Sequence, residues 1–146
     1  MKVKEALHNT ARTLAEGSIE TPLLEAELLL MHAMDMGRTE LYVKLDDDLP
    51  LRYSEALLGL VDRRLKREPA AYILGHREFY GFDFYVGPGV LIPRPETETL
   101  VDAAAAFIRS NFLHCDPIIA DIGTGSGAIA VSLARLFPRA VVYAAD

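Results

Sequence analysis

The chain has 146 residues, of which 51% are hydrophobic and 25% are charged, and its formal net charge is −6 at pH 7. This balance is typical of a folded globular protein and excludes a mainly disordered chain, and no apolar run reaches the ~20 residues of a membrane helix. The acidic charge argues against nucleic acid as the primary ligand. The single cysteine, Cys115, excludes an internal disulfide, which fits a cytoplasmic protein.

Residues 1–75 carry apolar side chains at helical spacing, which predicts a small α-helical bundle. A second helix is expected to begin at Pro22 and to be closed by Gly37 in the left-handed conformation. Thr39 is expected to cap a short third helix, and a fourth helix ends before Pro69. The apolar faces of the second and fourth helices are expected to include Leu24, Leu28, Leu57, Leu58, Val61 and Leu65.

Residues 76–95 are predicted to form an ordered connector. Aromatic residues alternate on both sides of Gly81, which predicts a β-hairpin, and prolines keep residues 90–95 extended. A helix is then predicted from Glu96 to about Arg109. Its apolar side is expected to contain Leu100, Val101, Ala104, Phe107 and Ile108.

Residues 96–146 are interpreted as the start of an α/β domain. Their pattern predicts, in order, a strand over 118–122, a glycine turn over 123–127, a helix over 128–136 and a second buried strand over 141–146. This order is typical of one βαβ unit of a Rossmann-like parallel sheet. A sheet of that kind needs further strands and cover on both faces, so the sequence is expected to be the front part of a longer protein.

The glycine turn is the strongest candidate for a binding site. Glycines let the backbone approach a ligand closely, and the following helix offers free N–H groups and the positive end of its dipole. Asp146 ends the next strand, near the ~20-residue offset at which an acidic side chain accepts hydrogen bonds from ribose hydroxyls. The combination predicts a cofactor that contains a nucleoside.

Two cofactors fit this turn. Gly123, Gly125 and Ala128 satisfy the dinucleotide pattern, so NAD stays open. Gly127 adds a further glycine, and Asp121, two residues before the turn, is suited to the ammonium group of a methionine moiety, which NAD lacks. The helix that precedes the first strand also suits a methyltransferase. S-adenosylmethionine is therefore the preferred cofactor.

Other kinds of site fail on residue identity. Ser126 is not flanked by the glycines of a hydrolase nucleophile turn, and there is no phosphate-binding Gly-Lys-Ser/Thr sequence. The histidines are scattered singly, and Cys115 has no partner cysteine, so no metal site is expected. The neighbouring pair His114 and Cys115 is interpreted as part of a loop.

Three stretches together resemble the release-factor glutamine methyltransferases of the HemK/PrmC family. They are residues 77–80 (REFY), 91–98 (LIPRPETE) and 120–130 (ADIGTGSGAIA). The resemblance implies an S-adenosylmethionine-dependent enzyme of translation termination that methylates the side-chain amide of the glutamine in the Gly-Gly-Gln motif of peptide chain release factors. It implies that residues 1–75 dock the release factor, with no direct contact to nucleic acid or membrane. The cofactor residues that it implies are Gly123, Thr124, Gly125, Ser126, Gly127 and Asp146.

One departure from the family concerns catalysis. The family's Asn-Pro-Pro-Tyr motif positions the substrate amide, but the only asparagines of this chain are Asn9 and Asn111, and neither precedes proline. No catalytic residue is therefore assigned, and residues 1–146 alone are expected to transfer no methyl group. A fragment of an NAD-dependent oxidoreductase and a non-catalytic protein-interaction module remain as alternatives, whereas the acidic charge disfavours a DNA methyltransferase.

Overall fold

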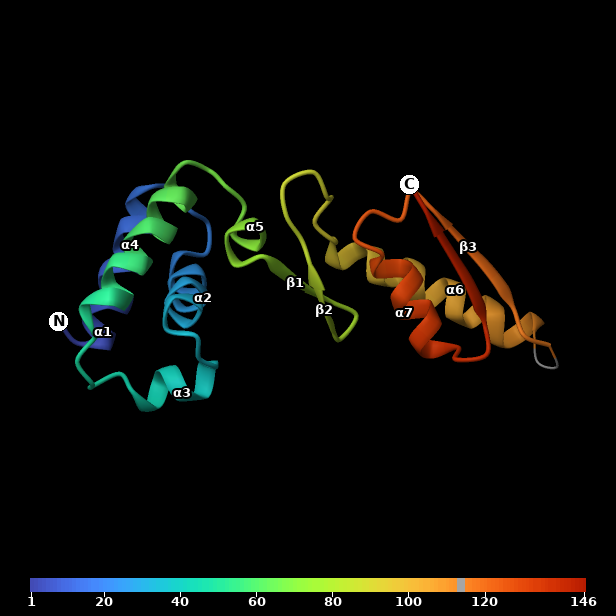
Figure 1. Ribbon diagram of the computed structural model, residues 1–146, viewed down its shortest axis with the longest axis horizontal. Helices are drawn as coiled ribbons and strands as arrows, with labels where there is room; N and C mark the ends of the chain where they lie inside the picture. The colour runs from blue at the N-terminus through green and yellow to red at the C-terminus, as the bar shows by residue number, and fades with distance from the viewer. Residues whose placement is uncertain (113–114) are drawn as a thin grey trace. The chain divides into compact units, whose positions relative to one another are not determined.

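The computed structural model describes residues 1–112 and 115–146 and divides the chain into two compact units, Met1–Leu74 and Gly75–Asp146 (Figure 1). The predicted loop residue His114 lies outside the described residues, whereas Cys115 is exposed. A helical first unit and a second unit that begins an α/β arrangement agree with the fold class predicted from the sequence.

The first unit is built from helices. They are α1 (Val3–Glu16), α2 (Pro22–Met34), α3 (Arg38–Val43), α4 (Leu51–Leu65) and α5 (Ala70–Leu74). Helices α1 and α4 pack against each other and against α2, and they enclose a core of aliphatic side chains. The fully buried members of this core include Val3, Leu14, Leu29, Leu30 and Leu41. The core is thus formed by apolar side chains at the helical spacing that predicted the helices.

The predicted ends of α2 and α3 are wrong. Asp35, not Gly37, closes α2 in the left-handed conformation, with φ 51°. Aspartate tolerates this conformation because its short polar side chain bonds locally. Gly37 has φ −79° and is the N-cap of α3, so Thr39 lies inside that helix and does not cap it.

The predicted apolar faces are also wrong in part. Leu24 of α2 and Leu58 and Leu65 of α4 are exposed, so the buried stripe of each helix is narrower than its predicted apolar face. Pro69 does follow α4, but it also directly precedes the short helix α5, which the sequence pattern did not predict. The carbonyl of Pro69 accepts hydrogen bonds from Tyr72 N and Ile73 N, and a proline suits the start of a helix because the N–H that it lacks has no partner there.

The second unit begins with a hairpin and continues with a βαβ unit. Its elements are β1 (His76–Phe79), β2 (Phe82–Tyr85), the 3-10 turn η1 (Pro95–Thr97), α6 (Glu98–Asn111), β3 (Ile118–Ile122), α7 (Ala128–Leu136) and β4 (Val141–Ala145). Strands β1 and β2 are antiparallel, and β3 and β4 are parallel with Ile118 opposite Val141. The predicted hairpin, glycine turn and βαβ order are confirmed.

The core of the second unit joins the hairpin to both helices. Phe79 and Phe84 of the hairpin pack with Val101 and Ile108 of α6 and with Leu133 of α7. Helix α7 packs on the two parallel strands. Alternate strand side chains point away from that helix, so the prediction of two buried strands is wrong: Ile118, Ile122, Val141 and Tyr143 are exposed in the described chain. Leu100 and Phe107 of α6, predicted on its apolar side, are exposed as well.

A cluster of carboxylates holds the hairpin turn against α6. Tyr80 has a left-handed backbone with φ 52°, a conformation that is strained for a bulky residue. Its N–H donates to Glu98 Oε1 at 2.8 Å, and the next N–H, of Gly81, donates to Glu78 Oε1 at 2.8 Å. The Tyr80 hydroxyl donates to Asp102 Oδ1 at 2.7 Å, and this hydrogen bond raises the pKa of Tyr80. These bonds compensate for the strain of the turn.

Replacing Glu98 with alanine is expected to destabilise the second unit by about 1–3 kcal/mol, because the Tyr80 N–H loses a charged acceptor. Urea unfolding followed through the amide NMR signals of Phe79 and Val101 measures the change. Glu96→Ala in the same acidic stretch is the matched control, since Glu96 contributes its backbone carbonyl and not its carboxylate to the bond with Thr99. Equal stability of the two variants would contradict this role for Glu98.

Candidate functional site

The glycine loop, residues 123–127, lies at the carboxyl edge of the parallel pair β3–β4. The N–H groups of Gly123 and Thr124 both donate to the carbonyl of Ala145 in β4, at 2.7 and 3.1 Å. Gly125 N donates to Asp146 Oδ1 at 3.0 Å. The loop is thus joined to the end of the neighbouring strand by backbone and side-chain bonds. In open α/β sheets this edge is where ligands bind.

The loop conformation requires glycine at three positions. Gly123, Gly125 and Gly127 have φ of 80°, 55° and 77°, a region that side chains with a Cβ rarely adopt. A Cβ built on Gly123 or Gly125 would meet no other atom of the described chain within 4 Å. Conformation therefore requires these glycines, and the space above them is open to a ligand.

Asp121 is the internal support of the loop. Its Oδ2 accepts a hydrogen bond from Thr124 Oγ1 at 2.8 Å and another from Ala130 N at 3.2 Å. Ala130 lies in the first turn of α7, where N–H groups have no partner within the helix, and the N-cap residue Gly127 has no side chain to supply one. Asp121 takes the place of the missing cap, and its charge is favourable at the positive end of the helix dipole.

All seven residues that the sequence marked as candidates lie at this one edge: Asp121, Gly123, Thr124, Gly125, Ser126, Gly127 and Asp146. Asp121, Thr124 and Ser126 are half-buried, whereas Asp146 is exposed. Sequence reasoning did not identify Thr124 as the hydrogen-bond partner of Asp121. The three-residue spacing of an acid and a hydroxyl across a tight turn is the signal that could have found it.

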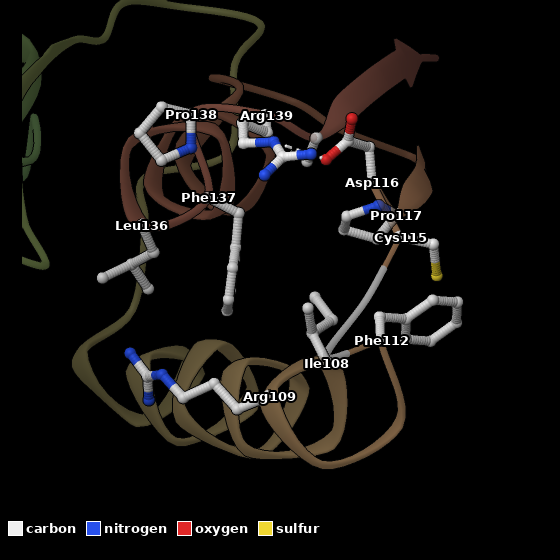
Figure 2. A pocket seen from close by; sticks show the side chains of 11 residues that line it. Ile108, Arg109, Phe112, Cys115, Asp116, Pro117, Leu136, Phe137, Pro138 and Arg139 are labelled. Atoms are coloured by element: carbon white, nitrogen blue, oxygen red, sulfur yellow. Dashed lines mark ion pairs between the residues drawn. The ribbon is translucent and has the colours of Figure 1, made fainter.

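A separate hollow of about 550 Å³ lies at the other end of the strands (Figure 2). The Arg109 guanidinium of α6 stands 5.6 Å from the centre of the Phe137 ring, and Arg139 pairs with Asp116 at 2.8 Å. The hollow is lined by Pro117 and Ala140, which directly precede β3 and β4. The glycine loop follows β3 at its opposite end, so the hollow and the loop are separate sites.

Within the described ranges, no group of three or more His, Cys, Asp or Glu side chains is placed to hold a metal ion. None of the helices in those same ranges is both long and apolar enough to cross a membrane.

Comparison with known proteins gives two kinds of similarity. Residues 5–75 match the family model described as the PrmC N-terminal domain. The whole chain is 44% identical to a release factor glutamine methyltransferase of Moorella thermoacetica and covers 50% of that protein. The namesakes from Koribacter versatilis and Geobacter sulfurreducens are also 44% identical, over 100% and 99% of this chain and 51% and 49% of their own lengths. The chain spans about half the length of these relatives.

Replacing Asp121 with alanine is expected to expose the Ala130 N–H to solvent and to speed its hydrogen exchange roughly tenfold to a hundredfold, because a charged acceptor is lost. Exchange measured by NMR reports this amide directly. Thr124→Val is the matched control: it removes the second donor but leaves the bond from Ala130 N in place, so a smaller change is expected. Unchanged exchange in Asp121→Ala would show that Asp121 does not cap α7.

Proposed function

We propose that this chain works as part of a release factor glutamine methyltransferase, because residues 5–75 match the PrmC N-terminal domain and the whole chain is similar to such enzymes. The proposed reaction transfers a methyl group from S-adenosylmethionine to the side-chain amide nitrogen of the glutamine in the Gly-Gly-Gln motif of a peptide chain release factor. Because translation termination takes place in the cytoplasm, we place the protein there.

The glycine loop fits the proposed cofactor. The backbone at Gly123 and Gly125 faces open space, as the approach of an adenosine group requires. Asp146 lies at the end of β4, where its carboxylate is suited to ribose hydroxyls. Its bond from Gly125 N leaves acceptor capacity, since an ionised carboxylate has about four lone-pair sites. The meeting of this loop with Asp146 is the observation that carries the choice of cofactor.

The proposed mechanism is one of holding and positioning. When bound, S-adenosylmethionine supplies an electrophilic methyl group on a positively charged sulfur. Asp121 has its Oδ2 engaged by Thr124 and Ala130, and its carboxylate would hold the cofactor's ammonium group. Such fixed carboxylates bind without reorganising, which is the advantage of a preformed site.

Besides a bound cofactor, methyl transfer requires that the substrate amide be aligned with the methyl group. The amide nitrogen is a poor nucleophile, because its lone pair is delocalised. Positioning residues can contribute strongly to such a reaction. Asn9 lies in α1, and Asn111 donates its side-chain N–H to the Phe107 carbonyl at the end of α6. We therefore assign amide alignment to no residue within 1–146.

The proposed division of labour follows the domain boundaries expected from the sequence. Residues 1–75 dock the release factor, residues 76–95 connect, and residues 96–146 begin a Rossmann-like methyltransferase domain. The separate core of each compact unit supports a boundary near residue 75, and the hairpin within 76–95 packs in the core of the second unit.

Cofactor choice is tested by isothermal titration calorimetry of the product of the whole gene with S-adenosylmethionine and, separately, NAD. Binding of S-adenosylmethionine is expected, and Asp146→Ala is expected to weaken it by ~1.5–3 kcal/mol, the range for hydrogen bonds to a charged group. Asp116→Ala is the matched control, because it removes the same kind of side chain at the opposite end of the strands, outside the glycine loop. Preferential binding of NAD would favour the oxidoreductase alternative.

Methyl transfer is tested with the product of the whole gene, labelled S-adenosylmethionine and a purified release factor. We expect label in the release factor and none after its Gly-Gly-Gln glutamine is changed to alanine. Residues 1–146 alone are expected to give no transfer, because they lack the amide-aligning motif. Label on another residue, or on DNA, would overturn the proposed function.

A further inference from the structure

Helix α3 of the first unit presents an exposed face with the composition of a binding surface. Arg38, Thr39, Tyr42 and Val43 line a shallow hollow of about 510 Å³. Arg38 and Tyr42 are one helical turn apart, so their side chains are neighbours on that face. Val43 is 78% exposed and Tyr42 is 47% exposed, whereas Leu41 on the opposite side is fully buried in the core. Tyrosine and arginine are the residues enriched where proteins bind each other most strongly.

A buried carboxylate beneath α3 holds this face in place. Glu27 of α2 is only 3% exposed, and the Tyr42 hydroxyl donates to its Oε1. Its Oε2 lies 3.0 Å from Arg38 Nη2 in an ion pair, yet no donor of the described chain meets it with hydrogen-bond geometry. Both partners of the buried charge are therefore side chains of the exposed α3 face.

This arrangement is costly if it serves stability alone. Burying a carboxylate is unfavourable, and well-packed apolar residues often replace a buried ion pair without loss of stability. What the pair does achieve is to fix two long surface side chains. The Arg38 guanidinium is held 5.9 Å from the centre of the Tyr42 ring, with its side chain still 66% exposed. A surface fixed in advance loses less side-chain entropy on binding.

We propose that the α3 face (Arg38, Thr39, Tyr42 and Val43) is the surface of the helical unit that docks the release factor. This inference rests on the proposed function, since it names where the proposed partner binds. The matching segment of the release factor offers an apolar side chain to Tyr42 and Val43 and a carboxylate to the outward N–H groups of Arg38. Charge complementarity specifies the carboxylate, because Arg38 is the one charged side chain lining the hollow within the described residues.

Calorimetric titration of the chain with a purified release factor tests the proposal. Val43→Glu places a negative charge on the face where a carboxylate is expected, and it should weaken binding about tenfold or more, as should Arg38→Ala. Leu58→Glu is the matched control, because Leu58 is 67% exposed on α4 and outside the hollow. That control should leave affinity within about twofold. Circular dichroism melting curves check that each variant is folded.

Glu27→Gln tests the positioning role separately. The substitution keeps the shape of the side chain but removes its charge. It should therefore weaken binding of the folded protein to the release factor, although Tyr42 and Arg38 are still present. A purely structural role would lower the melting temperature and leave the affinity unchanged, which would overturn the positioning argument.

The outcomes separate this inference from the proposed function. Equal weakening by Val43→Glu and Leu58→Glu, or none by either, overturns docking at α3, as does the absence of any binding by the unaltered chain. Binding of S-adenosylmethionine is measured without the release factor and is assigned to the second unit, and methyl transfer is measured with the product of the whole gene. They show independently whether the proposed function also fails.

Discussion

Parallel pairing of β3 with β4 is the constraint on which the candidate site depends. Two parallel strands need a crossover, here α7, and the crossover brings both carboxyl ends to one edge of the sheet. The glycine loop and Asp146 meet there because each directly follows a strand. Asp121, the fourth residue of β3, reaches the first turn of α7 from the same edge. The site is a consequence of the topology.

Carboxylates do much of the internal bracing in both units, which gives the acidic composition a structural meaning. Asp121 caps α7 from outside the helix, and Glu98 holds a strained N–H in the hairpin turn. Glu27 fixes two side chains of α3 from within the first core. Asp121 and Glu98 each accept a bond from a backbone N–H, and bonds to charged groups are the stronger kind.

The two units carry different parts of the proposed activity. The first has its own aliphatic core and the exposed α3 face, and the second has an aromatic and aliphatic core and the glycine loop. Binding of a protein and binding of a cofactor are thus assigned to separate segments. The similarity to known methyltransferases runs through both units, because it extends over the whole chain.

The sequence by itself determined the helical first unit, the hairpin and the strand, loop and helix order of the βαβ unit. Their signals are local: side-chain periodicity, and glycines at positions that need positive φ. Tertiary structure alone decided that Asp35 and not Gly37 ends α2, that Leu58 is exposed while Glu27 is buried, and that Asp121 reaches Ala130. Burial and these bonds depend on which elements pack together, and that packing is determined by contacts between residues distant in sequence. The pattern of side chains along one segment therefore does not predict this packing.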